Sequence, residues 1–209
     1  MKKIILVFCF FSTYAFSQSE VESYLINNID SIQNAINLDS FGKLDAIQGI
    51  RIWSNSQVVE LYKKDENIYL GCIINFIAHY NFENEYVDYV YEESKLSSKQ
   101  AKKLLNQINF EELRYLNASN NIEDNNLKIE GLYNYIIEFG YKNEIKRYSY
   151  WLSTNNEYEV HGVLKINNIH NFLIKTISKL KLIEKFTKFR NQLPKGIYVN
   201  GKMVFYKTF

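Results

Sequence analysis

The sequence contains little cysteine, glycine or proline. Its 209 residues include two Cys, eight Gly and one Pro. Eight glycines leave little material for a glycine-rich phosphate loop, and neither that loop nor the Gly-x-Ser-x-Gly motif of serine hydrolases occurs. The Cys-x-x-Cys and His-Glu-x-x-His spacings of common zinc sites do not occur either. The sequence therefore predicts no metal and no cofactor, and it identifies no catalytic residue.

Long apolar runs are also missing, apart from a short one near the start of the chain. Residues 4–11 are an unbroken apolar run that follows two lysines, and small residues, Ala15 and Ser17, stand where a signal peptidase would need them. This pattern is typical of a secretory signal peptide. The run is too short to cross a bilayer, which takes about 20 apolar residues. We expect residues 1–17 to be removed and the protein to be periplasmic or extracellular.

The remaining residues, 18–209, have the length of one ordinary domain. No other apolar stretch approaches membrane length, so no transmembrane segment is expected in the mature chain. Only Cys72 is left after cleavage, which excludes an intramolecular disulfide. It lies in an apolar, strand-like run, where a buried and unreactive thiol is the default interpretation.

Charge is divided unevenly along the chain. Residues 18–160 hold 13 basic and 22 acidic residues, whereas residues 161–209 hold 10 basic residues and a single acid, Glu184. One interpretation is that the two halves attract each other within one fold. The other is that the basic part meets an anionic partner. Export and a mature net charge of zero both disfavour nucleic acid as that partner.

Hydrophobic periodicity predicts an α+β fold with an antiparallel sheet. The sheet is expected to consist of a four-strand meander plus hairpins, packed with an N-terminal helix, a middle helix and a broken C-terminal helical segment. The expected helices lie near 20–37, at 98–108, and before and after a break near 180–182. The expected strands lie at 50–53, 59–62, 68–79 and 85–91, in a hairpin over 127–152, and in a hairpin at 197–205.

Two local patterns give sharper predictions. Ser97 and Gln100 have the spacing of a capping box at the start of the middle helix. In the 127–152 hairpin, a turn at Lys142 and Asn143 places Glu138 opposite Arg147, which is a favourable cross-strand pair. The same register puts apolar and aromatic side chains on one face of the hairpin, and we expect that face to be core.

One segment resembles a known group of proteins. The run from Leu96 to Phe110, which begins Leu-Ser-Ser-Lys-Gln, follows strands and precedes an aromatic strand pair. This layout, over much of residues 47–180, resembles uncharacterised small exported proteins of Gram-negative bacteria. The resemblance implies export but no activity, and no named enzyme family is indicated.

The preferred hypothesis is an exported, non-catalytic binding module of the cell envelope or extracellular space. Its expected partner is an acidic envelope or extracellular macromolecule. On an ideal helix Lys181, Lys185 and Lys188 share with Glu184 the face away from the apolar stripe, and the three lysines are the candidate partner-binding residues.

Two alternatives stay open. The first is an extracytoplasmic hydrolase without a recognisable motif, which would need a pocket that brings together His161, a carboxylate and a hydroxyl or Cys72. The second is a glycan or small-molecule carrier. That protein would need an exposed cleft lined by Trp53, Trp151 or the tyrosines of the 127–152 hairpin.

Overall fold

Strands and helices fall largely where the periodicity places them. The computed structural model describes residues 28–81, 86–114, 133–141, 144–152, 166–200 and 203–208. The expected signal peptide at 1–17 and His161 lie outside the described residues. The strands are β1 (Gln48–Trp53), β2 (Gln57–Lys63), β3 (Tyr69–Asn81), β4 (Tyr86–Lys95), β5 (Tyr133–Tyr141), β6 (Glu144–Leu152), β7 (Gly196–Asn200) and β8 (Met203–Lys207). The helices are residues 28–35, the 3-10 turn η1 (Phe41–Lys43), α2 (Ser98–Leu105), α3 (Phe110–Arg114), α4 (Ile166–Lys179) and α5 (Leu182–Gln192).

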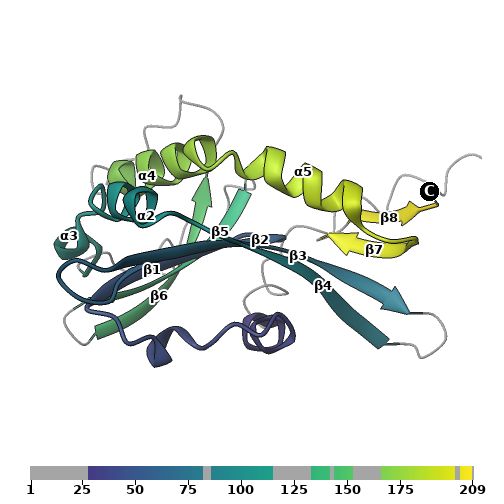
Figure 1. The fold of residues 1–209 in the computed structure, drawn as a ribbon, viewed down its shortest axis with the longest axis horizontal. Helices are drawn as coiled ribbons and strands as arrows, with labels where there is room; N and C mark the ends of the chain where they lie inside the picture. The colour runs from purple at the N-terminus through teal and green to yellow at the C-terminus, as the bar shows by residue number, and fades with distance from the viewer. Residues whose placement is uncertain are drawn as a thin grey trace, which may run out of the picture.

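All eight described strands belong to one antiparallel sheet, which confirms the α+β prediction. The strand order is β6-β5-β1-β2-β3-β7-β8, and β4 pairs with β3. Strands β1 to β4 pair consecutively along the chain. The later hairpins extend this sheet at two places, because β5 pairs with β1 and β7 pairs with β3 (Figure 1). Neither junction follows from the sequence pattern.

Strand β3 organises the sheet because it is the longest strand. Residues 72–81 pair with β4 along one edge. The other edge therefore has to serve both β2, which pairs with residues 69–75, and β7, which pairs with residues 78–80. The apolar composition of β3 on both faces suits a strand that is covered on both sides.

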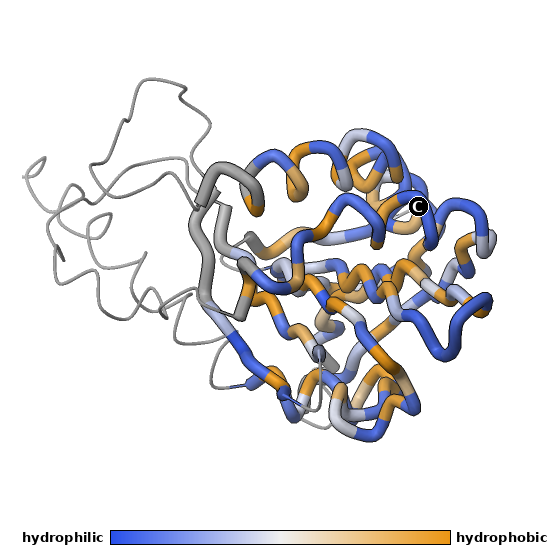
Figure 2. Tube along the Cα trace, turned by 90° about the vertical axis from the view of Figure 1, so that its left-hand side faces the viewer, coloured by the Kyte–Doolittle hydropathy of each residue, from blue (hydrophilic) through white to orange (hydrophobic). Residues whose placement is uncertain are grey.

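The two faces of the sheet carry separate cores. Helices α2, α4 and α5 lie on one face, and residues 28–35 lie on the other (Figure 1). Figure 2 shows hydrophobic segments concentrated in the central strands, with hydrophilic residues along the outer turns of the helices. The helical side buries Ile50, Leu61, Ile73, Phe139 and Leu173, and the opposite side buries Ile29, Ile32, Trp53, Val58 and Phe76.

Helix α2 begins as its sequence predicts. The Ser97 side chain accepts a hydrogen bond from the Gln100 backbone, and the Gln100 side chain accepts one from the Ser97 backbone. This reciprocal capping box satisfies two of the N–H groups that a helix start leaves unpaired. The helix ends at Leu105, three residues before the predicted end, and Ile108 still packs on the core from the following turn.

The predicted break between the two C-terminal helices is present. Helix α4 ends at Lys179 and α5 starts at Leu182, with Lys181 in the left-handed region at φ 52°. Two apolar stripes displaced around a single straight helix could not both reach the same sheet. The left-handed conformation at Lys181 breaks the helix, so that α4 can bury Leu173 while α5 buries Phe189.

The 127–152 hairpin has the expected register over the described residues. Tyr141 pairs with Glu144, and Glu138 pairs with Arg147. The Arg147 guanidinium donates to Glu138 Oε1 from Nη2 at 2.7 Å and from Nε at 3.0 Å. The aromatic face of β5 is core, as expected, since Ile137 and Phe139 are almost completely buried.

Candidate functional site

The outer surface of the helical layer is strongly basic. Helix α2 contributes three Lys, α4 two Lys, and α5 two Lys and one Arg, while Glu184 is their only acid. Of these eight cations all but Lys185 are exposed. Helix α2 comes from the acidic part of the chain, so this surface combines basic residues from both halves. We call it the basic layer: Lys99, Lys102, Lys103, Lys175, Lys179, Lys185, Lys188 and Arg190, together with Lys181 at the helix break.

Ion pairs to the basic layer are scarce among the described residues. Within the part of the chain that the structure describes, Lys181 is the only member that makes an ion pair, with Glu184 at 3.3 Å. Lys179 donates instead to the amide oxygen of Gln107, and Lys102 lies over the ring of Tyr69. Lysines that lack a carboxylate partner keep their charge available to a ligand.

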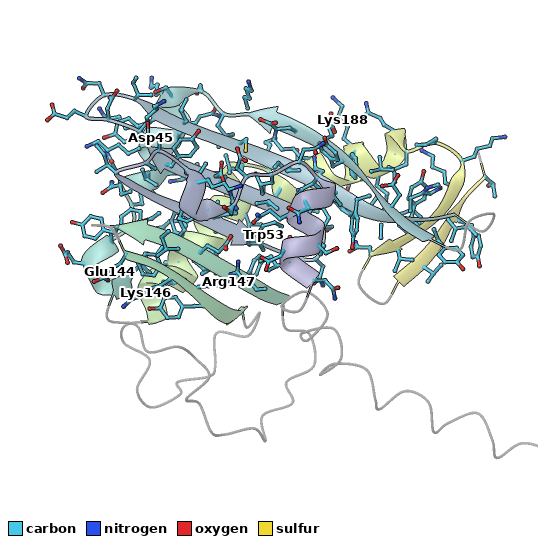
Figure 3. All side chains as sticks on the ribbon, turned by 90° about the horizontal axis from the view of Figure 1, so that it is seen from below. Asp45, Trp53, Glu144, Lys146, Arg147 and Lys188 are labelled. Atoms are coloured by element: carbon cyan, nitrogen blue, oxygen red, sulfur yellow. The ribbon has the colours of Figure 1, made fainter. Side chains whose placement is uncertain are left out.

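The three lysines predicted to form a partner-binding face do not occupy equivalent positions. Lys181 and Lys188 are exposed, and Lys188 lies at one edge of the molecule in Figure 3. Lys185 is half-buried because it lies closer to the apolar stripe of α5. Lys181 and Lys188 are therefore the more accessible residues of this face. No pattern in the sequence indicated that α2 and α4 would widen it.

The residues considered for catalysis do not come together among the described residues. Cys72 is buried, and burial together with Glu60 and Glu93 raises the pKa of its thiol to about 12. A thiol with so high a pKa is protonated at neutral pH and is a poor nucleophile. The hydrolase hypothesis also needs His161, which lies outside the described residues. No group of three or more potential metal ligands occurs within the described ranges.

The burial of Trp53 counts against the carrier hypothesis. Trp53 is completely buried, and its indole Nε1 donates to Glu138 Oε2 at 2.7 Å. Tyr135 of the hairpin is buried as well. These rings cannot line an exposed cleft, because they are part of the two cores. The side chain of Trp151 is outside the described set.

A row of charged residues crosses the sheet on the face covered by residues 28–35. Arg147, Glu138, Arg51 and Glu60 are register partners on the neighbouring strands β6, β5, β1 and β2. We call these four residues the ionic row. Arg51 is completely buried, and Glu60 and Glu138 are only 5% and 3% exposed. Charges alternate in sign along the row, so Glu138 lies between two arginines and Glu60 lies beside Arg51.

Every nitrogen of the Arg51 guanidinium has a polar partner. Its Nε and Nη2 donate to Glu60 Oε2, and its Nη1 lies 3.6 Å from Glu138 Oε2. The remaining donors reach the side chain of Gln33 and the carbonyl of Asp39, which precedes η1. Arg147 also pairs with Asp30 at 3.6 Å. The ionic row therefore fixes the N-terminal helix on the sheet, which is a structural role.

The charge pattern of the ionic row is only partly visible in the sequence. Glu138 and Arg147 were paired from hairpin register, whereas Arg51 and Glu60 looked like the polar faces of two alternating strands. Their burial depends on the helix that covers them. A charged residue within each of these strands was the available signal, but alternation alone cannot show which face is covered.

One polar pocket opens beside the basic layer. Gln107, Asn109, Asn171, Phe172 and Lys175 line it, between the end of α2 and helix α4. Its volume is about 240 Å³. With one cation and three amides it has polar groups for a small ligand, but it contains no nucleophile and no acid–base pair. It forms part of the basic layer rather than a catalytic site.

Comparison of the chain with protein-family models, with curated proteins and with solved structures finds no match. Its function is therefore inferred from its own geometry. Within the described residues, no helix is both long enough and apolar enough to cross a membrane. The feature with the clearest chemical preference is the basic layer.

Proposed function

We propose that this protein is an exported, non-catalytic binding module, and that its basic layer contacts an acidic partner in the cell envelope or extracellular space. One observation carries the proposal: eight cations and one acid occupy three neighbouring helices. The described carboxylates leave those eight cations without ion pairs. A surface of one sign attracts ligands of the opposite sign and accelerates their encounter.

The experiment compares capture of envelope components by two variants with the same change in charge. The first carries Lys181→Glu, Lys185→Glu and Lys188→Glu. The control carries Lys43→Glu, Lys64→Glu and Lys95→Glu, which are exposed and lie outside the three basic helices. We expect the first variant to lose salt-sensitive capture and the control to keep it. Equal capture by both variants would remove the basic layer from consideration.

Export is tested separately by mass spectrometry of the N-terminus of the native protein. The proposal requires a chain that starts at or near Gln18. Cytosolic protein that retains its first residues would exclude an envelope partner.

A further inference from the structure

Strand β8 is an edge strand with two strongly exposed hydrophobic residues. Val204 is 54% exposed and Tyr206 is 69% exposed. The strand pairs with β7 along one side, and within the described residues nothing pairs with its other side (Figure 1). An open strand edge offers backbone N–H and C=O groups to another strand. Exposed apolar side chains and an open edge therefore occur together on β8.

Charge distinguishes β8 from the other edge strands. Charged side chains are a common protection of strand edges against pairing with other chains. Strands β4 and β6 each have one described neighbour; β4 carries three acids and a lysine, and β6 carries an acid, a lysine and an arginine. The only charged residue of β8 is its last, Lys207, whose ammonium donates to carbonyl oxygens at the end of α5 in the same chain. The centre of β8 therefore lacks this protection.

The register shows which backbone groups of β8 face outward. Two residues separate Asn200 from Met203, and the pair that closes a two-residue loop exchanges hydrogen bonds. Hydrogen-bonded pairs alternate along an antiparallel ladder. Phe205 therefore bonds to β7, whereas the N–H and C=O groups of Val204 and Tyr206 point away from β7. These groups meet no partner among the described residues, so they are available to a further strand.

The exposed side chains of β8 continue an uncharged surface of the sheet. Two cross-strand rows over β3, β7 and β8 form it: Ala78, Val199 and Val204, and Tyr80, Ile197 and Tyr206. Phe205 and Tyr198 point to the opposite face, where they pack with Phe189 of α5. A surface without charge offers nothing to attract an acidic or a basic partner, and it matches a surface that is equally uncharged. A second copy of this chain provides such a surface.

We propose that β8 pairs with β8 of a second copy, antiparallel about a two-fold axis at Phe205. This register places Val204 opposite the partner's Tyr206, and Tyr206 opposite the partner's Val204. The open backbone groups then exchange hydrogen bonds, and each pair joins an aromatic to a β-branched side chain, which is a favourable combination. A two-fold interface is self-complementary, so assembly stops at the dimer. Opposite residues share a face, so both basic layers lie on one side of the joined sheet.

The test is sedimentation velocity of the wild-type protein at increasing concentration, up to its limit of solubility. We expect a reversible monomer–dimer equilibrium, since one short strand makes a small interface. Val204→Lys places a charge at the centre of the edge and should raise the dimer dissociation constant about tenfold. The matched control is Ile145→Lys, which makes the same change at a 56% exposed position of edge strand β6 and should dimerise like wild type.

Tyr206→Pro tests the backbone pairing. Proline removes an N–H that points out of the sheet, so the monomer keeps its bonds between β7 and β8 while the dimer loses bonds at both pairs. Circular dichroism checks that the variant folds. Wild type that stays monomeric at every concentration, or a dimer that the two β8 variants leave unchanged, would overturn the inference. Loss of the dimer in Ile145→Lys alone would place the interface on β6 and overturn it as well. None of these outcomes bears on capture of acidic partners by the basic layer.

Discussion

Arg51 is the residue on which the N-terminal half of the fold depends most clearly. Its guanidinium is completely withdrawn from water between Glu60 and Glu138, and it lies 5.3 Å from the ring centre of Phe41. Removing one partner of a buried ion pair leaves the other charge without compensation. The loss is therefore larger than the net contribution of the pair.

We predict that Arg51→Met lowers the free energy of unfolding by about 3–5 kcal/mol at neutral pH, because two buried carboxylates then face each other without their shared cation. Chemical denaturation measures the loss. The control is Lys64→Met, whose ion pair with Asp45 is exposed and contributes about 1 kcal/mol or less. Adding Glu60→Gln to Arg51→Met should restore part of the stability. If the double variant were no more stable than Arg51→Met alone, the two residues would not be coupled energetically.

Glu60 makes the stability of the protein depend on pH. Burial raises its pKa above the ordinary value of 4.5, the Arg51 charge and hydrogen bonds lower it, and Glu138 and Glu93 raise it again, with a net increase. The folded state thus holds the Glu60 proton more tightly than the unfolded state. The stabilising contribution is complete below pH 4.5 and is lost as the pH rises through the pKa of the folded state.

The measurement is the unfolding free energy of wild type minus that of Glu60→Gln, followed from below pH 4.5 to pH 8. The glutamine does not titrate, so contributions of other groups largely cancel. We expect the difference to decrease as the pH rises. An increase would mean that attraction by Arg51 exceeds the effect of burial.

Among the elements, the junction of α4 and α5 shows how one residue sets the direction of a helix. Lys181 occupies the left-handed region, which costs a residue with a Cβ atom roughly 1–2 kcal/mol and glycine much less. The cost is offset because both apolar stripes then reach the sheet.

We predict that Lys181→Gly raises the free energy of unfolding by about 0.5–1 kcal/mol, since it relieves this backbone conformation. Lys185→Gly removes the same charge from inside α5 and should lower stability by about 1 kcal/mol. Thermal or chemical denaturation distinguishes the two. If both glycine variants were destabilised alike, the junction would not be left-handed in solution.

At the scale of the whole molecule, one sheet joins segments from both halves of the chain. Strand β3 contacts β2, β4 and β7, so the N-terminal meander and the C-terminal hairpin share a single central strand. Elements that share a strand are expected to unfold together.

We predict that Ile73→Ala, at a completely buried site on β3, lowers the unfolding free energy by about 2–5 kcal/mol. Far-ultraviolet circular dichroism and aromatic fluorescence should report the same shifted midpoint. Ile183→Ala, with the same chemistry at a 74% exposed site, should stay within about 0.5 kcal/mol of wild type. Separate transitions for the two probes would show that the sheet does not unfold as one unit.

Local features were determined by the sequence alone. The capping box at Ser97, the break near Lys181 and the register that pairs Glu138 with Arg147 each depend on residues close together in the chain. Helix periodicity, cap chemistry and hairpin register act over a few residues, so their pattern can be identified without the rest of the fold.

Tertiary structure alone decided how these pieces combine. It placed β5 beside β1 and β7 beside β3, it buried Arg51 and Glu60 under residues 28–35, and it brought α2 beside α4 to extend the basic layer. Each of these depends on contacts between residues far apart in the chain. An alternating strand looks the same whether its polar face meets water or a helix, and a lysine-rich helix looks the same alone or beside another. The candidate surface could thus be identified in α5 from sequence, whereas its extension over α2 and α4 could not.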